Sequence, residues 1–303
     1  MQNRRDFLKK ASLMLAGGVV APHILTSCGG QTASTASTEA AAEVAAKRLG
    51  LQLYSLRDMV RDDGIEATLK AVAEMGYTSL ETAGYNDGQL YSKAPAELKK
   101  MVEDLGMKLT SSHLSRNLTG DKDADMAWWD QATNAHAAAG MKYMIVPMSP
   151  LGGEGATMDN VKRYCDYFNE IALVTAGQSI QFGYHNHAFE FESKIDDVPV
   201  YDLMLENTSP RHVMFQLDVY WAKVGGYDPV EYMKKYAERI KVLHIKDEKA
   251  IGAHNVVDFK AVFDQANANG IKDWYVEVEK YDGTPQEDVK KSADFLLAAD
   301  YVK

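Results

Sequence analysis

Histidine and acidic residues recur where short apolar runs of strand type come to an end. His113, His185 and His244 lie at or near the ends of three such runs, and Asp218 and Glu277 lie near the ends of two more. A buried strand would normally carry Val, Ile or Leu at these positions. Imidazole and carboxylate groups together form the ligand set of Zn²⁺, Mn²⁺, Fe²⁺ and Co²⁺. The pattern therefore predicts a divalent-metal site.

These residues fall on elements that alternate regularly along the chain. Strand-like runs cover residues 49–56, 78–83, 108–113, 143–148, 181–187, 213–219, 242–246 and 274–278. Helical patterns cover residues 65–75, 95–105, 124–139, 157–176, 198–206, 228–238, 258–269 and 286–301. Strict alternation predicts a parallel sheet, and eight repeats predict an α/β fold closed into a single-domain (β/α)₈ TIM barrel. Chemistry in such a barrel gathers at the carboxyl ends of the strands, so the polar strand ends should lie together.

An open, doubly wound sheet is the alternative α/β architecture. That fold normally has a glycine-rich phosphate loop after its first strand. Here the corresponding turn runs from Tyr54 to Asp58 with the sequence YSLRD, which contains no glycine. The turn therefore favours the barrel.

The N-terminal segment predicts export. Arg4 and Arg5 precede an apolar run over residues 13–25 that is too short to span a membrane, so residues 1–27 resemble a twin-arginine signal peptide. Residues 25–28, LTSC, resemble a lipobox with Cys28 as the lipidated N-terminus. Residues 28–46 are mostly small or polar and predict a flexible tether. We expect a periplasmic or membrane-anchored lipoprotein of a Gram-negative envelope, which contacts the membrane only through Cys28.

Composition excludes several classes of protein. The chain has 303 residues, a net charge of −10 and two cysteines. An acidic surface repels phosphate backbones, which argues against nucleic-acid binding, and two cysteines exclude a disulfide-rich scaffold. Without residues 1–46, 257 residues remain (303 − 46), which is the length of one TIM barrel. The composition leaves the oligomeric state open, and a homo-oligomer is compatible with it.

Four motifs resemble the xylose-isomerase-like barrel superfamily, which includes sugar phosphate isomerases and epimerases, inosose dehydratase and endonuclease IV. They are Gly183–Phe191 (GYHNHAFEF), Leu217–Trp221 (LDVYW), Leu243–Asp247 (LHIKD) and Val276–Glu279 (VEVE). The resemblance extends over residues 49–303. It implies a metal-dependent enzyme that acts on a small carbohydrate.

The resemblance also implies a ligand set. The family holds its metal with a carboxylate on strand five, Asp on strand six, His on strand seven and Glu on strand eight. Asp218, His244 and Glu277 match the last three positions, and His185 stands where many members have glutamate. Imidazole binds the same divalent metals, but the change removes one of two glutamates that shuttle protons in the epimerases. Glu190 is the alternative ligand from strand five.

Further residues could take part in the chemistry. Strand alternation places Glu277 and Glu279 on one face, and we prefer Glu277 as the ligand with Glu279 as a nearby acid. By the same rule His187 lies beside the site, as a base or a substrate contact. Lys246 shares a face with the strand-seven histidine and could stabilise an enolate oxygen; a salt bridge to the adjacent acidic residues is the alternative.

Three residues are expected to contact substrate. Glu81 and His113 end the second and third predicted strands. Trp221 could offer a flat face to a sugar ring, with packing at the rim as the alternative.

The favoured function is proton transfer next to a carbonyl of a sugar or keto-sugar, as in an isomerase or epimerase. A divalent ion (Mn, Zn, Co, Fe or Mg) would stabilise the enediolate, and Glu277, Glu279 or His187 would act as the base. The alternative is a lyase or dehydratase acting on a keto-sugar such as a 3-keto-glycoside. Export favours such unphosphorylated substrates, since phosphorylated sugars are rare outside the cytoplasm. A non-catalytic sugar-binding lipoprotein and an endonuclease are weaker alternatives.

Overall fold

The computed structural model describes residues 47–303. The predicted signal peptide over residues 1–27, the lipidation site Cys28 and the tether over residues 28–46 lie outside this part of the chain. Among the described residues, no helix combines the length and the apolar character that crossing a membrane requires.

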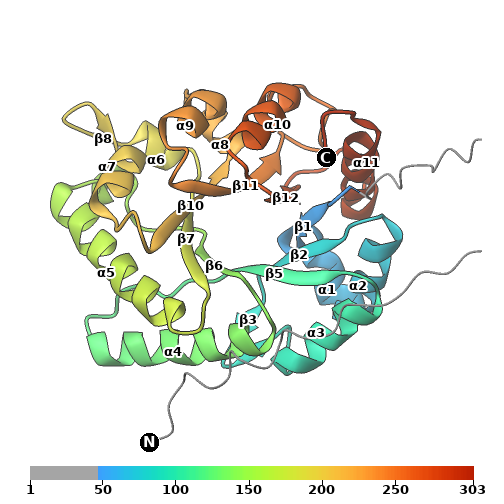
Figure 1. Ribbon diagram of the computed structural model, residues 1–303, viewed down its shortest axis with the longest axis horizontal. Coiled ribbons are helices and arrows are strands. Elements are labelled where there is room, and N and C mark those ends of the chain that lie inside the picture. The colour runs from blue at the N-terminus through green and yellow to red at the C-terminus, as the bar shows by residue number, and fades with distance from the viewer. Residues whose placement is uncertain (1–46) are drawn as a thin grey trace, which may run out of the picture. The chain divides into compact units, whose positions relative to one another are not determined.

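Eight parallel strands close into a barrel, which confirms the predicted fold (Figure 1). The strands are β1 Gly50–Gln52, β2 Ser79–Thr82, β5 Lys108–His113, β6 Tyr143–Val146, β7 Gln181–His185, β10 Val213–Asp218, β11 Ile240–Lys246 and β12 Asp273–Glu277. They follow one another around the barrel in chain order, and β1 pairs with both β2 and β12 to close it. At the closure, a Cβ on Gly50 would lie 2.1 Å from the carbonyl oxygen of Trp274, so only glycine fits there.

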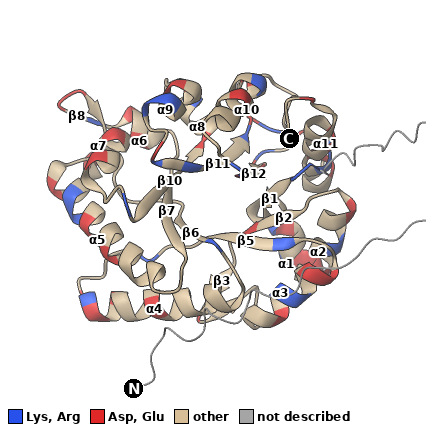
Figure 2. Cartoon of the chain, viewed as in Figure 1, with Lys and Arg blue, Asp and Glu red and all other residues tan. Residues whose placement is uncertain are grey.

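The barrel helices follow the predicted pattern closely. They are α2 Ile65–Glu74, α3 Pro95–Asp104, α4 Lys122–Ala138, α5 Met158–Ala176, α7 Val200–Asn207, α9 Pro229–Lys235, α10 Phe259–Ala268 and α11 Pro285–Ala298. Side-chain caps fix several helix starts, including a capping box between Thr284 and Glu287 at α11. Acidic and basic residues both occur along the outer helices (Figure 2), and some pair one turn apart, such as Lys100 with Asp104.

Several short elements were not predicted. They are the 3₁₀ turns η1 Leu53–Leu56 and η2 Gly153–Gly155, the helices α1 Arg57–Asp63, α6 Phe189–Glu192 and α8 Val219–Val224, and the hairpins β3 Tyr85–Asn86 with β4 Gln89–Leu90 and β8 Lys194–Ile195 with β9 Val198–Pro199. Most of these short elements come directly after a strand, at positions where the predicted strand extended beyond the end of the observed one. The Gln52 side chain accepts a hydrogen bond from the amide of Tyr54 and starts η1, and Asp218 does the same for Trp221 and starts α8. The polar residue that ends a strand thus begins the next turn.

A small apolar cluster lies in the barrel interior beneath the rim. Its members are Ile145, Met214, Val242 and Tyr275, all buried. Strand alternation puts Val242 on the same face of β11 as His244 and Lys246. The interior therefore changes from apolar packing to titratable side chains toward the carboxyl ends of the strands.

Candidate metal and substrate site

The four predicted ligands converge at the carboxyl ends of neighbouring strands. His185 ends β7, Asp218 ends β10, His244 lies near the end of β11 and Glu277 ends β12. Each offers one ligand atom, and these atoms all lie within 4.8 Å of one another. All four side chains are buried. The convergence follows from the parallel register, in which Asp218 is directly opposite His244.

Asp218 carries an oxygen without a partner. Its Oδ1 accepts a hydrogen bond of 2.8 Å from the amide of Trp221, whereas its buried Oδ2 accepts none from the described residues. Burial raises the pKa of Asp218 to about 7, although Lys246 and His244 oppose the shift. A buried carboxylate oxygen without a partner is destabilising unless a cation binds there. The oxygen is the feature that best fits a bound divalent ion.

The two histidines of the group differ in charge. Burial disfavours the charged form of His244, but Glu81 and Glu277 outweigh burial and raise the pKa of His244 to about 10. Nδ1 of His244 lies 3.3 Å from a Glu277 oxygen, and Nε2 contacts Glu81. For His185, burial lowers the pKa well below its ordinary value, and the nearby imidazoles lower it further. His185 is therefore a neutral imidazole, the form that binds metals.

Lys246 bridges the two glutamates of the β12 strand end. Its Nζ lies 3.3 Å from Glu277 and 3.1 Å from Glu279. The alternative of a salt bridge to the acidic residues that follow Lys246 is therefore wrong. Burial alone would raise the pKa of Glu277, but Lys246 and His244 hold it well below its ordinary value. Glu279 follows the end of β12, stays partly exposed and is not one of the four grouped ligands.

His187 and Trp221 lie side by side above the group. Their ring centroids are 5.8 Å apart, and Nδ1 of His187 is buried with no partner among the described residues. Burial lowers the pKa of His187 to about 4, so the imidazole is neutral and able to accept a proton. Trp221 packs against His187 and lies under the Lys246 ammonium, 5.6 Å away. It is absent from the cavity lining, which favours the packing alternative over a sugar platform.

Glu190, the alternative ligand from strand five, points elsewhere. It lies in α6, is fully buried and is not among the grouped ligand atoms. Its carboxylate accepts hydrogen bonds from the Tyr184 hydroxyl at 2.6 Å and from the amide of His187 at 2.8 Å. Burial raises the pKa of Glu190 to about 8. The structure thus groups His185, and not Glu190, with the other three residues.

Glu81 does not lie where a substrate contact was expected. The side chain has no exposed surface and is absent from the cavity lining. It accepts hydrogen bonds from Gln52, Ser111, Gln216 and His244. The strand position was predicted correctly, but the side chain faces the barrel interior beneath the histidines.

A cavity of about 730 Å³ opens above the group. Its polar lining includes His113, His185, His187, Glu277 and Glu279, so His113 lies where a substrate contact was expected. The sequence did not single out the other wall, which includes Tyr54, Arg57, Tyr85, Trp128 and Met148. Tyr54 and Met148 expose 44% and 55% of their surface, which leaves apolar area free to contact a ligand.

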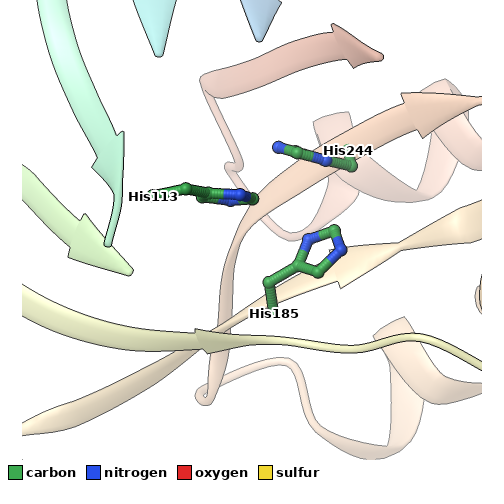
Figure 3. A group of neighbouring side chains, drawn as sticks. All are labelled: His113, His185 and His244. Atoms are coloured by element: carbon green, nitrogen blue, oxygen red, sulfur yellow. The ribbon is translucent and has the colours of Figure 1, made fainter. Parts of the chain in front are cut away.

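Three histidines form a second grouping (Figure 3). His113, His185 and His244 also offer ligand atoms within 4.8 Å of one another. The rings of His113 and His244 are stacked with centroids 4.9 Å apart. However, Nε2 of His113 and Nδ1 of His185 both contact the side-chain oxygen of Gln216, at 2.7 and 3.1 Å. Those nitrogens are engaged by the protein, so the group that includes Asp218 and Glu277 fits a metal better.

Comparisons with known proteins agree with this architecture. A family model described as xylose isomerase-like TIM barrel matches residues 69–299. The crystal structure of a sugar phosphate isomerase/epimerase from Parabacteroides distasonis ATCC 8503 is 39% identical and superposes with a TM-score of 0.78; the match covers 85% of this chain and all of that one. Inosose dehydratase of Geobacillus kaustophilus (strain HTA426) is 25% identical over 214 residues, which is 64% of each chain. The structure of an L-ribulose 3-epimerase shares the fold, with 16% identity, a TM-score of 0.67 and coverage of 82% of this chain and 93% of that one.

Proposed function

The chain belongs to the xylose isomerase-like TIM barrel family, and we propose that it is a divalent-metal-dependent isomerase or epimerase of a sugar or keto-sugar. One observation carries the proposal: the unpartnered Oδ2 of Asp218 lies within a group completed by His185, His244 and Glu277. Two imidazoles and two carboxylates suit Zn²⁺, Mn²⁺, Fe²⁺ or Co²⁺ better than Mg²⁺, which prefers oxygen ligands.

A bound ion would supply Lewis-acid chemistry to a substrate carbonyl, which acidifies the adjacent C–H bond. His187 is a neutral base that lines the cavity, and Glu279 lines it from another strand end. Because these side chains come from separate loops, neutral His187 would take the proton from a carbon while Glu279, in its protonated form, would supply one to the carbon from its own side. Proton exchange with solvent would then restore both side chains. Lys246 ends β11, is buried and is absent from the cavity lining, so its ammonium would act through the carboxylates of Glu277 and Glu279, with which it pairs, and not directly on a substrate oxygen.

The second candidate is a lyase or dehydratase acting on a keto-sugar such as a 3-keto-glycoside. Two observations favour it. His185 stands in place of a proton-shuttling glutamate, and the apolar cavity wall with Tyr54, Trp128 and Met148 offers room for a second ring or an aglycone. Elimination needs removal of one proton and departure of a β-substituent, so a single base suffices.

We also propose that the enzyme works outside the cytoplasm. Support comes from the sequence alone, through the paired arginines Arg4 and Arg5 and the lipobox-like residues that end at Cys28. Metabolic labelling with a palmitate analogue tests this: Cys28→Ala should abolish incorporation and release the protein from membranes. Labelling that persists in the variant would overturn the lipid anchor.

Isotope exchange tests the reaction. Free keto-sugars and 3-keto-glycosides are incubated with the metal-loaded protein in D₂O and followed by NMR. We expect deuterium at one carbon next to the carbonyl for an epimerase, and loss of a substituent for a lyase. A chelator should abolish either change. A sugar that binds equally well with and without chelator, with no exchange, would instead identify a non-catalytic binding protein.

A further inference from the structure

We infer that Glu81 and Gln216 are positioning residues that hold one protonated ring nitrogen each of His113, His185 and His244, and so present Nε2 of His185 and Nδ1 of His244 to the metal. The inference rests on the proposed function for its metal, but not for the hydrogen-bond pattern itself.

Glu81 is an acceptor in the middle of the barrel. Its Oε1 accepts from Gln52 at 2.8 Å, and its Oε2 accepts from Ser111 at 2.6 Å and from Gln216 Nε2 at 2.9 Å. Oε1 also contacts His244 Nε2. An ionised carboxylate has no proton to donate, so every partner must be the donor.

That rule orients Gln216. Its amide nitrogen must face Glu81, because the reverse orientation would oppose a carbonyl oxygen to a carboxylate. The carbonyl oxygen then faces His113 Nε2 at 2.7 Å and His185 Nδ1 at 3.1 Å. A carbonyl can only accept, so both ring nitrogens carry protons.

The tautomers follow from these contacts, and Figure 3 shows the three rings concerned. A neutral imidazole has one N–H, so His185 holds its proton on Nδ1 and leaves the Nε2 lone pair free. His244 donates through Nε2 to Glu81, so Nδ1 is the nitrogen beside Glu277 and Asp218, at 3.3 and 4.0 Å. In the metal-free protein the cationic ring also carries a proton on Nδ1, and a bound metal would take the place of that proton. A carboxylate behind a ligating histidine fixes the ring and raises its basicity. One carboxylate and one amide therefore set which nitrogen faces the metal in two ligands that lie on different strands.

The metal-free wild-type protein provides the first test. Long-range ¹H–¹⁵N correlation spectra of ¹⁵N-histidine-labelled protein distinguish the tautomers, and single His→Asn variants assign the signals. We expect the Nδ1–H form at His185 and the Nε2–H form at His113. Free histidine prefers Nε2–H, so the His185 result is diagnostic. The Nε2–H form or an imidazolium at His185 would overturn the inference, whether or not the protein binds metal.

Variants provide the second test. Gln216→Met keeps the length of the side chain but removes the acceptor, so His185 should lose its pure Nδ1–H form and Zn²⁺ affinity by calorimetry should fall about 10–100-fold. Thr82→Val is the control, because Thr82 is a buried neighbour of Glu81 whose hydroxyl, among the residues that the structure describes, bonds only to Ser112. Unchanged tautomers and affinity in a folded Gln216→Met protein would contradict the inference. Wild-type protein that shows the expected tautomers but binds no Zn²⁺ would contradict the proposed function alone.

Discussion

Asp218 has two carboxylate oxygens in unlike surroundings. Oδ1 caps α8 through the amide of Trp221, whereas Oδ2 lies among His185, His244 and Glu277 with no hydrogen-bond donor from residues 47–303. One atom thus has a structural role, and the other destabilises the metal-free fold. Because the two oxygens have different roles, a single substitution at Asp218 can remove metal binding and keep the helix cap.

Asp218→Asn should retain the cap and remove the charge. In chelator at pH 8, we expect the variant to unfold with a free energy equal to that of wild type or higher by about 1–3 kcal/mol, since a buried negative charge, whose pKa is raised to about 7, is replaced by a neutral amide. Added Zn²⁺ or Mn²⁺ should raise the melting temperature of wild type only. Equal stabilisation of both proteins by metal would show that Asp218 is not a ligand.

For single residues, the sequence predicted which residue types form the site better than it predicted how far below the barrel rim each side chain lies. Asp218, His244, Glu277 and His185 stood out because polar residues interrupt apolar strands, and the resemblance to xylose-isomerase-like barrels implied that these four are the ligands. Glu81 could also be found, but its burial beneath the histidines could not, because strand alternation gives a face and not a distance from the rim. Gln216 gave only a weak signal, since an amide in the apolar strand VMFQLD is neither a metal ligand nor a base.

Among the elements, the short helix α6 ties the segment after β7, which carries His187, to the barrel. Glu190 in α6 accepts from the amide of His187 and from Tyr184, whose hydroxyl also lies 2.8 Å from Ser149. The loop that carries His187 is therefore tied to β7 and to the segment after β6. Sequence periodicity could not reveal this link, because four helical residues are too few to show a period.

The raised pKa of Glu190 predicts a pH effect on stability. The folded carboxyl holds its proton up to about pH 8, whereas the ordinary value is 4.5, so the free energy of unfolding should fall as pH rises through this window. Glu190→Gln mimics the protonated acid and lacks the effect. The stability of the variant relative to wild type should therefore increase between pH 5 and pH 9, by up to about 5 kcal/mol. Urea denaturation at both pH values measures it, and a constant difference would contradict the raised pKa.

Strand ends were the least predictable elements. The predicted strand over residues 49–56 stops at Gln52, and that over residues 274–278 stops at Glu277. Local propensity continues past both points, but side-chain caps and the geometry of the rim end the pairing. Glu279 lies beyond the end of β12; it shares Lys246 with Glu277 but is not one of the grouped ligand residues.

On the scale of the whole molecule, closure of the barrel determines whether the ligands meet. The ligand strands β7, β10, β11 and β12 are consecutive, and β12 is held to β1 near Gly50, where Leu51 pairs with Val276. Alternation of eight strands and eight helices was enough to predict this closure. The unpredicted hairpins form separate two-stranded sheets, and neither they nor the unpredicted turns change the strand order of the barrel.

Gly50→Ala should damage the closure. The added Cβ would lie 2.1 Å from the Trp274 carbonyl oxygen, so strands must separate, and we expect a loss of at least about 2 kcal/mol in the free energy of unfolding. Gly177→Ala is the control. Gly177 has an ordinary helical backbone, and a Cβ added there would lie 3.2 Å from its nearest neighbour, the carbonyl oxygen of Val174. Thermal unfolding measures the stability of both variants. An equal loss of stability in Gly50→Ala and Gly177→Ala would contradict the tight packing at Gly50.

The most direct test of the central claim is a crystal structure of the protein with Mn²⁺, with the ion located by anomalous scattering. We predict one ion bound by His185 Nε2, Asp218 Oδ2, His244 Nδ1 and a Glu277 oxygen, at about 2.0–2.3 Å. No anomalous peak in this group, or an ion held by Glu190 with His185 beyond bonding distance, would contradict the account.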